Sequence, residues 1–155
     1  MSRWIKNWFS NYEPFDEPLI YQNLEFTCPE TFYQAMKSRK ELFWVREKIS
    51  KLTPGKAKRF WRKKENKQYL RPDWYYINHE VMEYALRYKF ARGTSWYIRL
   101  MKETGEIVET NNWHDNYWGN CICQRCRIKS KYNHLGKLLM KLREEFLDEE
   151  KKNER

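Results

Sequence analysis

The segment 30–38, ETFYQAMKS, has the pattern that most limits how this chain folds. Helical residues advance by about 100° each, so Glu30, Gln34 and Lys37 project from one face of a helix. The apolar residues between them project from the other face and require a core to pack against. The polar face has two interpretations that the segment alone leaves open, a solvated surface or one wall of an active site.

The residues just before this segment predict where the helix begins. Thr27 is a suitable N-cap, Pro29 suits the first turn, and Glu30 completes a capping-box pattern three residues after the threonine. Glu30 therefore has two possible roles, a structural one in the capping box and a chemical one in an active site.

The rest of the chain predicts an α+β fold that is mostly helical, with a few short strands. Helical patterns cover residues 29–40, 41–51, 54–64, 73–90, 94–101 and the chain from 133 onward; extended patterns cover 19–26 and 106–110. Thr53 is the expected N-cap of the third helix. One apolar stripe, predicted to face the core, is formed by Ile77, Val81, Tyr84, Ala85 and Tyr88.

Length and composition predict one domain over residues 1–147, followed by a charged C-terminal tail at 148–155. A chain of 155 residues has the size of one ordinary domain. No run approaches the eighteen or so apolar residues of a membrane span, and the start, MSRWIKNWF, lacks the apolar core of a signal peptide. We therefore expect a cytoplasmic protein that does not associate with a membrane.

Most of the positive charge lies in a basic segment, residues 37–71. It holds fourteen basic and three acidic residues, whereas the whole chain has a net charge of +10. Such a segment attracts polyanions, and the interleaved Trp44, Phe60, Trp61 and Tyr69 are candidate stacking partners for bases. The pattern fits a nucleic acid, a phosphorylated small molecule or a solvated basic face.

Three cysteines, Cys121, Cys123 and Cys126, form a C-x-C-x-x-C cluster with His114 and His134 nearby. Three thiolates and one imidazole could bind zinc. The spacing differs from the common paired C-x-x-C arrangement, and no second cysteine pair completes a ligand set. The sequence thus favours free thiols and no metal or cofactor, with zinc as the alternative.

Three segments in order resemble the NADAR family, the YbiA-like N-glycosidases. They are ETFYQAMKS at 30–38, IVETNNWHDNYWGN at 107–120 and the N-x-L-G-x-L-L-M-x-L-R pattern at 133–143. The resemblance extends over nearly the whole chain, from Trp8 to Arg143. It implies hydrolysis of an N-glycosidic bond between a ribose C1 and an amine or base. The implied substrates are amino-pyrimidine riboside phosphates of early riboflavin synthesis, or ADP-ribosylated guanine in nucleic acid.

The resemblance implies catalytic roles for Glu30, Asp115 and Lys37. Cleavage builds positive charge on the sugar and delivers a proton to the leaving nitrogen, which is work for carboxylates such as Glu30 and Asp115. Lys37 is a covalent alternative, because a partly desolvated amine can attack an aldose C1 and form a Schiff base that water resolves. Its alternative role is that of one more solvated lysine of the basic segment.

Binding roles are implied for residues around these groups. Gln34 and Trp118 are candidate substrate contacts, Trp118 by stacking or else as a core indole. Arg62, with Arg59 behind it, is the expected phosphate contact. Asn133 is a substrate contact or, by preference, the cap of the last helix. We expect the Glu30 face to form one wall of a pocket, with Asp115 and Trp118 opposite. The alternative is a non-catalytic module that binds ADP-ribose or nucleic acid through the basic segment.

Overall fold

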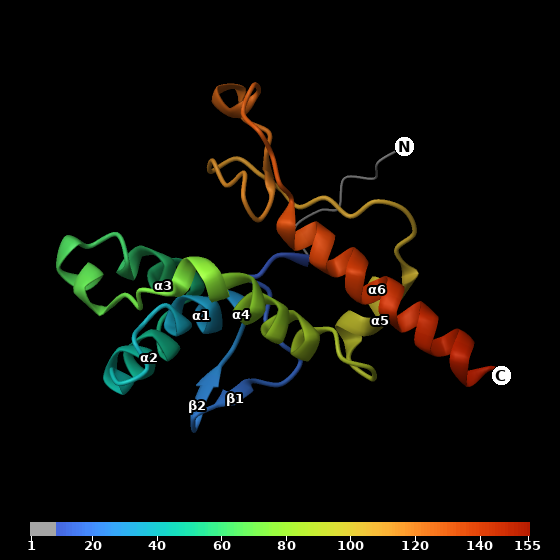
Figure 1. Cartoon of the computed structure of the whole chain (residues 1–155), viewed down its shortest axis with the longest axis horizontal. Helices are drawn as coiled ribbons and strands as arrows, with labels where there is room; N and C mark the ends of the chain where they lie inside the picture. The colour runs from blue at the N-terminus through green and yellow to red at the C-terminus, as the bar shows by residue number, and fades with distance from the viewer. Residues whose placement is uncertain (1–8) are drawn as a thin grey trace. The chain divides into compact units, whose positions relative to one another are not determined.

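The computed structural model describes residues 9–155, which divide into two compact units (Figure 1). One unit is Asn11–Trp96; the other contains Tyr97–Arg155 together with the chain before Asn11. Both consist mainly of helices with two short strands each, as predicted for an α+β fold rich in helix. Within the described residues, no helix is both long and apolar enough to cross a membrane.

The segment 19–26, predicted to be extended, forms a hairpin in the first unit. Strands β1 (Leu19–Tyr21) and β2 (Leu24–Phe26) pair antiparallel. Gln22 and Asn23 connect them with φ of 52° and 62°. Two left-handed residues in a two-residue loop match the twist of the flanking strands, which explains why the turn forms here.

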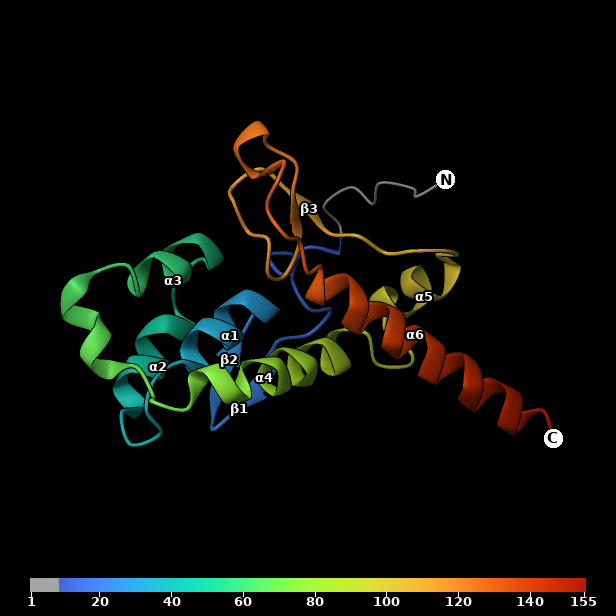
Figure 2. The same ribbon diagram turned by 45° about the horizontal axis from the view of Figure 1, so that its top comes forward.

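Helix α1 (Pro29–Met36) lies at the centre of the same unit. It packs against α2 (Phe43–Ser50), α3 (Pro54–Phe60) and α4 (Trp74–Lys89), and Figures 1 and 2 show it among these helices. All eight residues of α1 are buried. The interpretation of its polar face as a solvated surface is therefore wrong.

The predicted start of α1 is also wrong in detail. The N-cap is Cys28, with no side-chain capping bond, so Thr27 does not cap and no capping box forms. The backbone N–H of Glu30 instead donates to the Asn11 carbonyl at 3.0 Å. A tertiary partner thus replaces the local cap, and the Glu30 carboxylate is released from the capping role. The helix ends at Met36, with Lys37 as C-cap, rather than at residue 40.

Later helices of this unit start where predicted but differ in length or face. Thr53 caps α3 by accepting from Lys56 N at 3.4 Å, and α3 ends at Phe60 before a 3₁₀ helix, η2 (Lys64–Tyr69). The predicted apolar stripe of α4 is only partly correct: Ala85 belongs to the core and Val81 packs against it. The other buried residues of α4 lie outside the stripe and are Asn78, Met82, Leu86 and Lys89. Tyr84 and Tyr88 rest their rings on Phe32 and Phe15 at the edge of the core while remaining partly exposed.

One member of the basic segment, Arg46, is a buried structural residue. It is 1% exposed and donates to the Ser38 hydroxyl, the Ser38 carbonyl and the Gln22 side-chain oxygen. Burial lowers the pKa of Arg46. These hydrogen bonds join the hairpin to the end of α1, so Arg46 has a structural role in the first unit.

The second unit is organised around the long helix α6 (His134–Asn153). Helix α5 (Ser95–Lys102) starts at the end of the first unit. The strand predicted at 106–110 is shorter than expected and is β3 (Thr110–Asn111). It pairs in parallel with β4 (Asn120–Cys121). Helix α6 continues through most of the segment 148–155. The Tyr97 hydroxyl donates to Glu150 Oε1 at 2.9 Å, which holds this polar end.

A loop between β3 and α6 extends from the N-terminal end of α6 (Figure 2). Its two arms are joined by backbone hydrogen bonds from Tyr132, His134 and Leu135 to carbonyls of 116–118. It contains the short 3₁₀ helix η3 (Gln124–Cys126). These bonds hold the 115–118 turn against the start of α6.

Asn133 precedes α6 in a left-handed conformation, and the predicted side-chain cap is absent. Its amide instead bridges to the extended segment before β3. Nδ2 donates to the Ile107 carbonyl at 2.9 Å and Oδ1 accepts from Glu109 N at 3.0 Å. The side chain thereby takes the place of a neighbouring strand.

We expect Gly136→Ala to destabilise the protein, because a Cβ at this position would overlap the Ile107 carbonyl oxygen and the Asn133 side chain. The cost should be about 1–3 kcal/mol in the free energy of unfolding, measured by urea denaturation. Lys137→Ala, at the exposed neighbouring position, is the control and should change it by less than about 0.5 kcal/mol. Equal stability of the two variants would contradict this close approach of α6.

Candidate active site

Glu30 and Gln34 form a buried polar pair on α1. Glu30 is 7% exposed and Gln34 is 2% exposed, and Gln34 Nε2 donates to Glu30 Oε1 at 2.8 Å. The other amide atom, Gln34 Oε1, is buried and has no hydrogen-bond partner among residues 9–155. Because buried polar atoms are rarely left unpaired, this oxygen marks a place where a bound molecule can donate a hydrogen bond.

Asn11 contributes a second atom of the same kind. Its backbone carbonyl accepts the Glu30 N–H, and its side-chain Oδ1 is buried without a partner in the described part of the chain. Gln34 and Asn11 each form a hydrogen bond with Glu30, and each also has a buried side-chain oxygen without a partner among the described residues. Sugar hydroxyls and amines are donors that would satisfy them.

Lys37 is the C-cap residue of α1 and lies close enough to Glu30 for that carboxylate to influence its pKa. Its Nζ is 5.3 Å from the centre of the Tyr33 ring and 5.9 Å from that of Trp74. Burial lowers the pKa of Lys37 to about 8, opposed by the Glu30 carboxylate and assisted by Lys58. A lysine of this pKa is about one-tenth free amine at pH 7, and the free amine is the form that attacks carbon.

Arg59 and Arg62 are both exposed and lie close enough to Tyr12 to act on its ionisation. The pKa of Tyr12 is raised, mainly by desolvation and then by the Glu30 carboxylate, while the two arginines lower it. Tyr12 was not predicted, because a single tyrosine in an irregular segment has no sequence signal. Its pKa is influenced both by Glu30 and by the two predicted phosphate contacts, Arg59 and Arg62.

Trp61 joins the C-terminal end of α3 to α1. Its indole Nε1 donates to the Gln34 backbone carbonyl at 2.9 Å, and its ring is 7% exposed. Phe60 is buried as well, so neither ring is available to stack on a base. Of the four predicted stacking residues, Trp44 is half exposed and packs edge-on against Tyr69 at 4.9 Å.

A cavity of about 420 Å³ lies elsewhere in this unit. Phe32 and Met36 line it from α1, together with Arg46 and Arg71. None of the predicted site residues lines it. It therefore gives no support to their assignment.

In the second unit, Asp115 organises the turn that contains Trp118. Asp115 Oδ1 accepts from Tyr117 N at 3.0 Å and from Trp118 N at 2.9 Å, an arrangement typical of a side chain that stabilises its own turn. Trp118 is 9% exposed. Gly119 allows the strand contact, since a Cβ there would lie 2.7 Å from the Glu109 carbonyl oxygen. The catalytic role of Asp115, the substrate roles of Trp118 and Asn133, and the pairing of Asp115 with Glu30 stay predictions.

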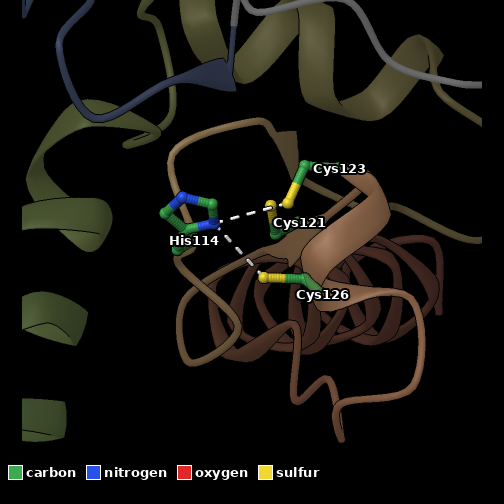
Figure 3. A group of neighbouring side chains, drawn as sticks. All are labelled: His114, Cys121, Cys123 and Cys126. Carbon is green, nitrogen blue, oxygen red and sulfur yellow. Dashed lines mark hydrogen bonds between the residues drawn. The ribbon is translucent and has the colours of Figure 1, made fainter.

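The three loop cysteines are brought together with His114 (Figure 3). Their potential ligand atoms all lie within 4.8 Å of one another. His134 is absent from this group, and its ring stacks on Tyr132 at 5.5 Å. The structure thus selects one of the two histidines that the sequence left as candidates.

Known proteins resemble this chain over most of its length. The family model described as NADAR domain matches residues 1–147. An N-glycosidase of Nostoc punctiforme is 30% identical over 140 residues, covering 89% of this chain and 84% of that protein. N-glycosidase YbiA of Escherichia coli strain K12 is 30% identical over 139 residues, covering 89% and 80%.

Two further relatives extend the comparison. A chloroplastic riboflavin biosynthesis protein PYRR of Zea mays is 31% identical over 150 residues, which cover 90% of this chain and 23% of that protein. The NMR structure of Escherichia coli YbiA has a TM-score of 0.70 and 30% sequence identity, covering 92% of this chain and 79% of that one. This likeness confirms the predicted fold class, and with the family match it confirms the resemblance: the chain belongs to the NADAR domain family.

Proposed function

We propose that this NADAR-domain protein is an N-glycosidase that hydrolyses the bond between a ribose C1 and an amine or base in a phosphorylated riboside or ADP-ribosyl substrate. The observation that carries the proposal is the buried Glu30 and Gln34 pair, with the low-pKa Lys37 at the C-terminal end of the same helix. The relatives named N-glycosidase support the reaction class.

The first half of the proposed reaction transfers the sugar to Lys37. The free amine of Lys37 bonds to C1 while the C1–N bond of the substrate breaks. The Glu30 carboxylate takes a proton from the attacking nitrogen and gives it to the leaving nitrogen, which departs as the neutral amine or base. Glu30 also offsets the positive charge that develops on the sugar.

The second half releases the sugar. The ring oxygen leaves C1 with a proton from the lysine nitrogen, so that a Schiff base forms between C1 and Lys37. Water adds to C1 and loses one proton, which Glu30 passes to the Lys37 nitrogen to give a carbinolamine. The hydroxyl on C1 then gives up its proton, again through Glu30, to the same nitrogen; the C1–Nζ bond breaks, C1 becomes a carbonyl and Lys37 regains its free amine. The net change is one water consumed, one sugar hydroxyl formed and one N–H formed on the leaving group.

The residues around Glu30 support a phosphorylated sugar as part of the proposed substrate. The unpartnered Gln34 Oε1 and Asn11 Oδ1 would accept hydrogen bonds from ribose hydroxyls. Arg59 and Arg62 are exposed cations with donors suited to phosphate oxygens. The name of the riboflavin biosynthesis relative favours an amino-pyrimidine riboside phosphate over ADP-ribosylated guanine as the first substrate to test.

The test is incubation of purified protein, without added metal, with an amino-pyrimidine riboside phosphate and separately with ADP-ribosylated guanine DNA. We expect free amine or base and free sugar phosphate from at least one of them, identified by mass. If both substrates bind in a salt-dependent manner but neither is cleaved at high protein concentration, the chain is a binding module that uses the basic segment, and the proposal fails.

A further inference from the structure

The cysteine loop of the second unit contains four side chains directed toward a common centre, those of His114, Cys121, Cys123 and Cys126 (Figure 3). His114 belongs to the turn after β3, Cys121 ends β4, Cys123 directly precedes η3 and Cys126 is its last residue. We propose that these four residues bind one zinc ion and that the site is structural.

The spacing of the donor atoms fits a tetrahedral zinc site. Zinc bonds of about 2.3 Å to sulfur and about 2.1 Å to nitrogen place neighbouring ligand atoms roughly 3.5–3.8 Å apart. His114 Nδ1 lies 3.3 Å from Cys123 Sγ and 3.4 Å from Cys126 Sγ, and all four atoms fall within 4.8 Å of one another. Side-chain torsion shifts of at most about 1 Å would bring the more distant donor atoms to this spacing.

Hydrogen bonds hold the backbone that carries the ligands. His114 has a φ of 71°, and Asn111 holds its turn by accepting from Trp113 N and Asp115 N. Lys131 Nζ donates to the carbonyls of Cys121 and Cys126 at 2.9 and 2.7 Å. The segments that supply the ligands are therefore tied together through bonds that do not involve the sulfur atoms.

A metal would account for the burial of the thiols in this loop. Cys121 and Cys126 are fully buried, whereas the isoleucines of the loop, Ile122 and Ile128, are 62% and 93% exposed. The large apolar side chains therefore contribute little burial, and a structural metal is a common source of folding energy for such segments.

The donor set points to zinc and to a structural role. Three soft thiolates and one imidazole in a tetrahedral arrangement suit zinc, and four protein ligands leave no open position for a substrate or water. The set with bound zinc has one net negative charge, and Arg125, Arg127, Lys129 and Lys131 in the same loop are basic residues that would offset it.

The test measures metal in the full chain, purified without a histidine tag under reducing conditions from cells supplied with zinc. We expect about one zinc ion per chain that survives dialysis, determined by plasma mass spectrometry. Cys126→Ser and His114→Ala should each lower the retained zinc at least about tenfold. Removing a residue that only hydrogen-bonds to a metal ligand already lowers metal affinity about tenfold or more, and these variants remove a ligand itself.

Cys28→Ser is the matched control. Cys28 is a buried cysteine of the other unit, 3.6 Å from the Thr31 hydroxyl, and does not belong to the cluster. This variant should keep its zinc. Equal zinc loss in Cys28→Ser and Cys126→Ser would contradict the assignment.

Cobalt binding provides a measurement on the unmutated chain, should the ligand variants fail to fold. Wild-type protein depleted of metal and given Co²⁺ should develop the thiolate-to-cobalt absorption of a tetrahedral site, and its three cluster thiols should become protected from Ellman's reagent. A wild-type protein without zinc whose thiols are unaffected by metal would overturn the proposal. A mass two hydrogens lower, which signals a disulfide within the cluster, would overturn it as well.

Discussion

Glu30→Gln should lower the rate of base or amine release by at least about a hundredfold, the size of effect typical of a lost general acid or base. Glutamine retains the shape of the side chain and a hydrogen bond to Gln34, but it can neither accept a proton nor offset positive charge on the sugar. The loss should appear mainly in kcat, because the carboxylate acts on charge that develops in the transition state. Product release quantified by mass against substrate concentration gives both constants.

The control for this variant is Glu25→Gln, which removes an exposed carboxylate in β2 of the same unit. It should retain wild-type activity. Thermal unfolding of both variants separates loss of chemistry from loss of fold. Normal turnover by a folded Glu30→Gln variant would show that Glu30 is a structural residue of α1 and would refute the mechanism.

Lys37→Arg should abolish the covalent route, with a loss of at least about a hundredfold in kcat. The guanidinium keeps the positive charge and the ring contacts with Tyr33 and Trp74, but it has no free amine to attack C1. Wild-type protein treated with borohydride during turnover should gain the mass of the reduced sugar, and peptide mapping should place it on Lys37.

The pH dependence gives an independent measure of the same residue. Burial lowers the pKa of Lys37 from 10.5 to about 8, and the reactive form is the deprotonated one, present above that pKa. Activity should therefore rise roughly tenfold per pH unit below pH 7 and level off above about pH 8. The exposed Lys102→Arg should leave both the profile and the trapped mass unchanged. A wild-type protein that turns over substrate but gains no mass with borohydride would exclude the Schiff base and leave a non-covalent role for Glu30.

Much of the fold could be predicted because its signals are local. The extended character of 19–26 follows from residue composition, and the start of α3 follows from the Thr53 cap and Pro54 within a few residues. The errors occur where a distant partner replaces a local one. The Asn11 carbonyl takes the Glu30 N–H in place of a capping box, and Ile107 and Glu109 engage Asn133 in place of a helix cap.

The predicted face of α4 was wrong at Tyr84 and Tyr88, which are partly exposed, for a related reason. A tyrosine counts as apolar in a periodic pattern, although its hydroxyl favours water and lets it stand at the margin of the core. Lys89 is the converse case, since it is fully buried with Nζ 4.3 Å from the Trp96 ring centre. Periodicity ranks residues by type, while packing decides which of them is covered.

The sequence by itself determined the family, the helical character of the fold and the common face of Glu30, Gln34 and Lys37, because motif order and helical spacing are properties of the chain alone. Tertiary structure decided what those residues can do. Burial of α1 among three helices pairs Glu30 with Gln34 and lowers the pKa of Lys37, and loop folding joins His114 to three cysteines. Desolvation and ligand geometry depend on distances between residues that are remote in sequence, so no local pattern can supply them.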